Sequence, residues 1–328
     1  MLGHSGVTVT RLSFGAAAIG NLFTEVPDED ARAAIDAAWE AGVRYFDTAP
    51  HYGLGLSERR LGAALRDRPR EEYVLSTKVG RLLEPVPPDG DDLANGFAVR
   101  ADHRRVWDFS ADGVLRSIEA SLVRLGLDRI DVAYLHDPDE HAAQAFGEAY
   151  PALERLRSEG VVRAIGAGMN QSALLERFVA DTDVDVVLLA GRYTLLDQEG
   201  LRGLLPEAAR RGVSVVAGGV FNSGLLADPR PGATFDYAPA SRELLDRALK
   251  IKATAERWDV PLRAAALRFP FGHPAVASVL VGFRSAAEAR DAAGLLDRDI
   301  PAGFWEELRT GGLLPGDVPV PETMGPCE

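Results

Sequence analysis

Four side chains suited to proton transfer follow neighbouring apolar segments of the chain: Asp47, Tyr52, Lys78 and His136. Asp47 and Lys78 each end one such segment, Tyr52 follows the first of them across a short turn, and His136 ends a third. If the segments are parallel strands of one sheet or barrel, their carboxyl ends meet at a single edge. The spacing therefore predicts that these four groups share one site.

Together the four groups could move a proton to or from a carbonyl or an alcohol. A free tyrosine has a pKa of about 10, which is too high for easy proton exchange near neutral pH. An ammonium nearby favours the phenolate, so Lys78, one of only three lysines in the chain, would lower the pKa of Tyr52. Asp47 can hold Lys78 in place, and His136 can hydrogen-bond a substrate oxygen. A redox reaction at such a site would need a separate hydride carrier.

Apolar, near-continuous segments alternate with helical patterns along most of the chain, as in parallel strands that are covered on both faces. The predicted strands are 12–16, 44–47, 73–78, 130–136, 162–167, 184–190, 213–217 and 276–281. The predicted helices between and after them are 28–41, 57–66, 110–125, 145–159, 172–180, 200–211, 262–269 and 285–295. Eight strand–helix units favour a (β/α)8 TIM barrel over an open doubly wound sheet.

Three stretches lie outside the repeat. Long loops are expected at 80–109, after the third strand, and at 219–241, after the seventh, and loops at this end of a barrel usually carry function. Extra helices are expected at 241–258 and 302–309, before an irregular tail from about residue 314. With no linker or shift in composition, we expect one domain over residues 1–328.

The bulk composition is that of an ordinary globular protein. The formal net charge of −13 argues against nucleic acid or an anionic membrane as a partner. Cys327 is the single cysteine, so no disulfide can form within the chain, and no apolar segment reaches membrane-spanning length. We expect a soluble cytoplasmic protein, monomeric or a small homo-oligomer, that acts on a small molecule.

Five segments carrying these residues resemble the aldo-keto reductase superfamily. They are Arg11-Leu12-Ser13-Phe14-Gly15, Phe46-Asp47-Thr48-Ala49 through Tyr52-Gly53, Ser76-Thr77-Lys78, Leu125-Gly126-Leu127-Asp128 through Leu135-His136, and Val281-Gly282-Phe283-Arg284-Ser285. The resemblance covers essentially the whole chain. It implies that Tyr52, Asp47, Lys78 and His136 are the catalytic residues, with Tyr52 as general acid and base.

The resemblance also implies an extended nicotinamide dinucleotide, NAD or NADP, bound without a Rossmann motif. Gly166-Ala167-Gly168 lacks the third glycine of that motif in register. Met169 and Asn170 stand where the family holds the carboxamide, and Tyr193 where a ring stacks on the nicotinamide. The remaining residues implied along the cofactor are Gly218, Gly219, Val220, Phe221, Asn222, Ser223, Gly224, Leu225, Gly282, Arg284, Ser285, Glu288 and Asp291.

Some positions depart from the family's commonest pattern. Glu288 falls where members that prefer NADP often have arginine, and Ala190, Thr194 and Ala292 replace frequent amides. A carboxylate at position 288 would repel a 2′-phosphate and could accept a hydrogen bond from a ribose hydroxyl, which favours NAD, although Arg284 could serve a phosphate.

Two stretches resemble the branch of sugar and pyridoxal dehydrogenases: Asp108-Phe109-Ser110-Ala111-Asp112-Gly113 and His136-Asp137-Pro138-Asp139. The branch implies oxidation of an aldose such as L-fucose, L-galactose or D-arabinose at C1 to the lactone. The alternatives within the family are a pyridoxal 4-dehydrogenase and a general NADPH-dependent reductase of aldehydes and ketones. Ile19, Trp107 and Phe109 are candidate walls of the substrate pocket.

Two alternatives come from other classes of protein. The histidines and carboxylates of 136–141 could hold a metal ion in a barrel hydrolase, but their spacing is that of a loop, and we expect no metal. The same scaffold could also form a non-catalytic nucleotide-binding subunit. Survival of activity in a chelator would dismiss the first alternative, and turnover of a sugar or aldehyde would dismiss the second.

Overall fold

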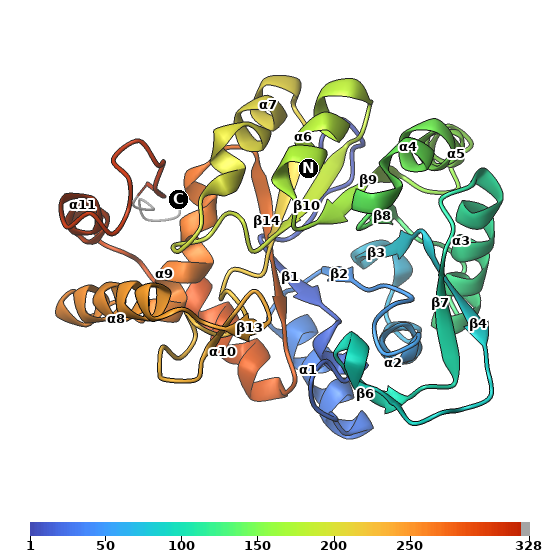
Figure 1. The fold of residues 1–328 in the computed structure, drawn as a ribbon, viewed down its shortest axis with the longest axis horizontal. Helices are drawn as coiled ribbons and strands as arrows, with labels where there is room; N and C mark the ends of the chain where they lie inside the picture. Colours follow the sequence, from blue (N-terminus) through green and yellow to red (C-terminus); the bar gives the residue numbers. More distant parts are fainter. Residues whose placement is uncertain (323–328) are drawn as a thin grey trace.

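Eight parallel strands close into a barrel at the centre of the computed structural model, which describes residues 1–322 (Figure 1). Around the barrel the order is β1-β14-β11-β10-β9-β8-β3-β2, so consecutive strand–helix units lie side by side. The strands are β1 (Leu12–Gly15), β2 (Tyr45–Asp47), β3 (Val74–Val79), β8 (Val132–His136), β9 (Ala164–Met169), β10 (Val186–Ala190), β11 (Ser214–Gly218) and β14 (Val276–Gly282). The TIM barrel prediction is confirmed, and Gly166 and Gly168 are residues of β9 rather than of a nucleotide-binding turn.

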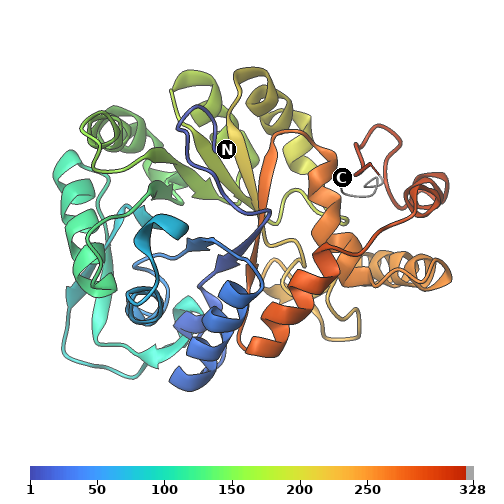
Figure 2. The same ribbon diagram turned by 180° about the vertical axis from the view of Figure 1, so that it is seen from behind.

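Helices form the outer ring and bury their apolar faces against the strands (Figures 1 and 2). Ser110, Ser241 and Ser285 each accept a hydrogen bond from a backbone N–H in the first turn of α3, α8 and α10, which is why those helices begin there. The helices are α1 (Asp28–Glu40), α2 (Leu56–Leu65), α3 (Ala111–Leu125), α4 (Ala142–Gln144), α5 (Tyr150–Ser158), α6 (Ser172–Asp181), α7 (Leu204–Arg211), α8 (Arg242–Arg257), α9 (Leu262–Arg268), α10 (Ala286–Leu296) and α11 (Ala302–Thr310).

Two details of the helix prediction were wrong. The helix predicted at 200–211 is divided: a 3-10 turn at Glu199–Arg202 comes first, and α7 begins only at Leu204. The helix predicted at 145–159 starts with a π-helical turn at Ala145–Ala149, which joins α4 to α5 without a break. Pro151 has no N–H to donate to the preceding turn, and a widened turn there accommodates the missing bond.

The interior of the barrel is closed at its amino-terminal end. Leu2 and Val7 are fully buried and pack with strand residues that include Tyr45 and Tyr134, whose hydroxyls lie 2.9 Å apart. Figure 2 shows the amino-terminal segment crossing in front of the strands. With this end sealed, ligands can enter only at the carboxyl ends of the strands.

The two predicted long loops carry strands of their own. Residues 80–109 contain the antiparallel pairs β4 (Arg81–Pro85) with β7 (His103–Trp107) and β5 (Asp91–Asp92) with β6 (Phe97–Arg100). Residues 219–241 contain the short hairpin of β12 (Thr234–Phe235) and β13 (Ala238–Pro239). We call residues 80–109 the insertion; it follows β3 and so reaches the open end of the barrel.

The structure describes the predicted tail only as far as residue 322. Residues 314–322 form neither helix nor strand, and Cys327 lies outside the described residues. Within residues 1–322, no helix is both long enough and apolar enough to cross a bilayer.

Candidate active site

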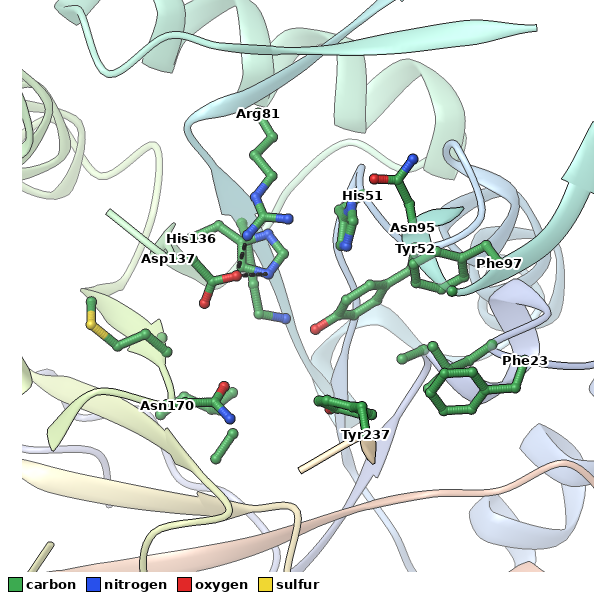
Figure 3. A pocket seen from close by; sticks show the side chains of 18 of the residues that line it. Phe23, His51, Tyr52, Arg81, Asn95, Phe97, His136, Asp137, Asn170 and Tyr237 are labelled. Carbon is green, nitrogen blue, oxygen red and sulfur yellow. Dashed lines mark hydrogen bonds and ion pairs between the residues drawn. The ribbon is translucent and has the colours of Figure 1, made fainter. Parts of the chain in front are cut away.

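The four predicted catalytic residues meet at the open end of the barrel (Figure 3 shows Tyr52 and His136). Lys78 Nζ donates to Asp47 Oδ2 at 2.6 Å and to the carbonyl of Thr48 at 3.0 Å, and both charged side chains are almost fully buried. The same ammonium lies 4.6 Å from the centroid of the Tyr52 ring. The His136 ring stands edge-on to Tyr52, with 5.8 Å between ring centroids.

Electrostatics divide the four groups into a charged pair and two neutral groups. Burial lowers the pKa of Lys78, but the attraction of Asp47 and Tyr52 outweighs it, so the pKa lies above its ordinary value and Lys78 stays protonated. Burial lowers the pKa of His136 far below its ordinary value, and the charges of Arg81 and Lys78 lower it further, so the imidazole is neutral. A neutral imidazole can donate one hydrogen bond to a substrate oxygen.

The pKa of Tyr52 differs from the sequence-based prediction. Burial raises it above 10, and the ammonium of Lys78 opposes this rise without cancelling it. The prediction was correct about the sign of the Lys78 contribution and wrong about the net direction, because the sequence does not reveal how deeply the phenol is buried. Tyr52 is therefore a protonated phenol at neutral pH in the free protein.

The loop that carries Tyr52 packs tightly on the loop after β1. Gly53 has a φ of +61°, and a Cβ at this position would lie 2.2 Å from the carbonyl oxygen of Gly20. Gly42 also has a positive φ, +86°, but a Cβ there would have no atom within 4 Å. Both glycines have the left-handed backbone conformation, but of the two only Gly53 would bring a Cβ against the Gly20 carbonyl.

We expect Gly53→Ala to reduce kcat by about 10²-fold, because the clash must move the backbone next to Tyr52. The matched control Gly42→Ala should cost only the strain of a left-handed alanine, about 1–2 kcal/mol of unfolding free energy, and leave kcat unchanged. Steady-state kinetics and denaturant unfolding of both variants provide the test. Equal kinetics for the two would mean that the contact with Gly20 does not position Tyr52.

A cavity of about 610 Å³ lies over Tyr52 and His136; we call it the catalytic pocket. Its walls are rich in hydrogen-bonding groups, of which His51, Arg81, Asn95 and Asp137 were not assigned to a site from the sequence. Arg81 pairs with Asp137, and Asp137 Oδ2 lies 3.7 Å from His136 Nε2 (Figure 3). His51 and Asp137 are adjacent in sequence to Tyr52 and His136. This adjacency could have indicated from the sequence that both residues line the pocket.

The three predicted pocket walls do not line this cavity. Ile19 and Phe109 are fully buried, and Phe109 packs under Gly80, where a Cβ would lie 2.3 Å from its ring. Trp107 stacks on Phe109 and lies 4.3 Å from the guanidinium of Arg81. The aromatic walls are instead Phe23, Phe97 and Tyr237.

A second cavity of about 410 Å³ continues from the catalytic pocket; we call it the groove. Tyr52, Asn170 and Tyr237 line both cavities, and the groove ends at Arg284 and Glu288. The residues predicted along the cofactor that line the groove are Asn170, Gly218, Gly219, Val220, Phe221, Asn222, Ser223, Gly224, Gly282, Arg284 and Glu288.

The other five predicted cofactor residues lie elsewhere. Met169 lines the catalytic pocket, and Leu225 is fully buried. Tyr193 is buried in the core against Phe269, 5.1 Å between ring centroids, and does not line either cavity. Ser285 caps α10, and Asp291 pairs with Arg263 on the surface.

The groove fits an extended dinucleotide. Six glycines line it, so much of its wall is bare backbone: Gly15, Gly191, Gly218, Gly219, Gly224 and Gly282. Asn222 donates its amide hydrogen to the carbonyl of Gly191, but its buried Oδ1 has no hydrogen-bond partner among residues 1–322. An unpaired buried oxygen in the wall is costly unless a ligand supplies a donor.

Comparison with known proteins decides the family. The Aldo/keto reductase family profile matches residues 11–310. The chain belongs to this family. The match spans every barrel strand and both cavities, and it establishes the protein as an NAD(P)-dependent oxidoreductase.

The chain is similar along most of its length to three named enzymes. It is 49% identical over 317 residues to D-threo-aldose 1-dehydrogenase of a Pseudomonas species, covering 95% of this chain and 96% of the relative. It is 42% identical to pyridoxal 4-dehydrogenase of Microbacterium luteolum, covering 95% and 97%, and 33% identical to L-galactose dehydrogenase of Arabidopsis thaliana, covering 88% and 85%. Among solved structures, the holo form of an aldo-keto reductase from Bacillus halodurans superposes with a TM-score of 0.76 at 26% identity, covering 97% and 96%.

The histidine and carboxylate run at 136–141 does not form a metal cluster. In the part of the chain that the structure describes, no three His, Cys, Asp or Glu side chains gather where they could hold a metal ion. His136 and Asp137 face the catalytic pocket, whereas His141 packs against Trp107 and Phe109.

Proposed function

We propose that this enzyme oxidises an aldose of the L-fucose, L-galactose or D-arabinose type at C1 to the lactone. The observation that carries the proposal is the composition of the catalytic pocket, where His51, Arg81, Asn95 and Asp137 surround Tyr52 with groups that can bind several hydroxyls. The 49% identity to D-threo-aldose 1-dehydrogenase supports the same substrate class.

In this direction Tyr52 first loses its own proton to solvent, and the phenolate then takes the proton of the anomeric hydroxyl as the carbonyl forms. Lys78 makes that transfer easier, because its fixed charge stabilises the phenolate, and Asp47 keeps the ammonium in place at 2.6 Å. Neutral His136 orients the reacting oxygen by a hydrogen bond. A nicotinamide cofactor bound along the groove would supply the acceptor for the hydride that leaves C1.

We further propose that NAD is preferred over NADP. Glu288 lines the end of the groove, where its Oε2 accepts a hydrogen bond from the backbone N–H of Arg284 at 2.8 Å. The Glu288 carboxylate therefore already accepts from the Arg284 N–H, a donor near the start of α10 that a 2′-phosphate would otherwise use. Its negative charge also repels that phosphate.

Glu288→Gln should raise the ratio of kcat/KM with NADP to kcat/KM with NAD by at least about tenfold, because one like-charge repulsion is removed. Asp291→Asn is the matched control: this carboxylate pairs with Arg263 outside the groove, so its neutralisation should leave the ratio unchanged. A ratio that responds to Asp291 and not to Glu288 would overturn the assignment.

The substrate is tested by initial rates of nicotinamide reduction with NAD or NADP and a panel of aldoses plus pyridoxal. Reduction with L-fucose, L-galactose or D-arabinose supports the proposal. Pyridoxal is the second candidate, because Phe23, Phe97 and Tyr237 could enclose a flat ring and because a relative at 42% identity is a pyridoxal 4-dehydrogenase. Silence with every sugar, together with NADPH-dependent reduction of simple aldehydes, would assign a general carbonyl reductase.

A further inference from the structure

The insertion contributes a buried chain of polar groups that ends at the catalytic pocket. Asp92, in β5, is 4% exposed and accepts two hydrogen bonds from the guanidinium of Arg105, in β7, at 2.8 and 2.5 Å. Asn95 donates its amide hydrogen to the same carboxylate at 2.8 Å. On its other side Arg105 donates to Nδ1 of His51 at 2.5 Å and to the backbone carbonyl of His51 at 3.0 Å.

In this series of polar groups, the chemistry of each group decides which partner donates each hydrogen bond and which accepts it. A guanidinium has only donors and stays protonated in proteins, so Nδ1 of His51 must be the acceptor. A neutral imidazole whose Nδ1 accepts carries its hydrogen on Nε2. No residue among 1–322 forms a hydrogen bond with that Nε2, and His51 lines the catalytic pocket beside Tyr52 (Figure 3).

The same reasoning orients Asn95. An ionised carboxylate only accepts, so Asn95 turns its NH2 group towards Asp92, and its Oδ1 is left as an acceptor. Asn95 and His51 line the same cavity. The pocket is thus offered one donor, His51 Nε2–H, and one acceptor, Asn95 Oδ1, which is the complement of an alcohol hydroxyl.

We propose that Asp92 and Arg105 are positioning residues that fix His51 as a donor and Asn95 as an acceptor, and that this pair binds one hydroxyl of the substrate away from the reacting carbon. The identity of the substrate as a polyhydroxylated sugar rests on the proposed function. The tautomer of His51 does not rest on it. Burial, reinforced by Arg81, Arg105 and Lys78, lowers the pKa of His51 to about 2, so the ring remains a neutral donor throughout the working pH range.

The tautomer is tested first, by nitrogen-15 NMR of the histidine side chains in the substrate-free enzyme, with His51→Gln to assign the signal. We expect a bare Nδ1 and a protonated Nε2 between about pH 6 and pH 8, the range in which an ordinary histidine titrates. A hydrogen on Nδ1, or a ring that titrates in this range, would overturn the proposal whether or not the protein oxidises sugars.

The role in binding is tested with Arg105→Met, using the panel substrate that turns over fastest. Losing one well-oriented hydrogen bond should raise KM about tenfold and change kcat less than about threefold. Arg105→Lys keeps a charged donor and should recover part of the loss. Arg104→Met is the matched control, because Arg104 is the preceding residue of β7 and pairs instead with Glu84, which lines neither cavity.

The bound hydroxyl is identified with the monodeoxy forms of the same sugar. One of them should show the same KM with Arg105→Met and with the native enzyme, because the hydroxyl that His51 and Asn95 bind is missing from it. If Arg105→Met alters the tautomer but not KM for any substrate, the hydroxyl-binding part of the proposal is wrong. If no sugar is oxidised at all, the proposed function fails. The tautomer result still decides whether Arg105 fixes His51 as a hydrogen-bond donor to the pocket.

Discussion

Tyr52→Phe should lower kcat by about 10³-fold while leaving the affinity for the nicotinamide cofactor nearly unchanged, because it removes a proton-transferring hydroxyl and little else. The ring of Tyr52 keeps its contacts with Phe97 and His136, at 6.1 and 5.8 Å between centroids, so the shape of the pocket is retained. Rates of nicotinamide reduction and a fluorescence titration of the cofactor would measure the two effects separately.

Tyr150→Phe is the matched control for this substitution. Tyr150 begins α5 in the outer ring, and its hydroxyl bonds to Glu154 and to the backbone N–H of Asp183. The control should turn over at the native rate. Near-native turnover by Tyr52→Phe would mean that another group carries the proton.

Lys78→Met should lower kcat for oxidation by about 10²-fold or more and shift its pH profile, because the phenolate of Tyr52 loses its stabilising charge. The pKa of Tyr52 already lies above 10 through burial, with Lys78 opposing the rise, so removing Lys78 moves it higher. Oxidation requires the deprotonated phenol, so its rate should rise with pH, and the rise should move to higher pH in the variant. Reduction requires the protonated phenol and should stay flat through neutral pH.

The substitution also leaves the Asp47 carboxylate buried without its cation, which should cost about 3–5 kcal/mol of unfolding free energy. The double variant Asp47→Asn/Lys78→Met removes both charges, so it should regain much of this stability but not the activity. Denaturant unfolding and kinetics of the single and double variants separate folding from catalysis. An unchanged rate and pH profile in stable Lys78→Met would remove Lys78 from the mechanism.

The barrel, and the meeting of the four proposed catalytic groups at its open end, were predictable because both follow from local pattern. Near-continuous apolar segments predict strands covered on both faces, and parallel strands bring the polar residues at their ends, such as Asp47 and His136, to one edge. The residues from Gly218 to Gly224 were expected along the cofactor only from the resemblance to the aldo-keto reductases, and all of them line the groove.

Features that depend on how the long insertion folds could not be predicted. The contact of Arg105 with His51 joins residues 54 positions apart, and it exists only because β4 and β7 pair. Trp107 and Phe109 are aromatic residues of that insertion, but whether they face the cavity or support Arg81 depends on the pairing. Tyr193 has the residue type expected for ring stacking, yet it packs into the core against Phe269.

The most direct test of aldose oxidation at C1 by this enzyme uses a sugar of the L-fucose, L-galactose or D-arabinose type carrying deuterium at C1, incubated with NAD and analysed by mass spectrometry. Direct hydride transfer predicts that the reduced nicotinamide gains one deuterium and that the sugar becomes its lactone. Formation of reduced nicotinamide without the label, or no lactone with any sugar of this group, would contradict the assignment of C1 oxidation.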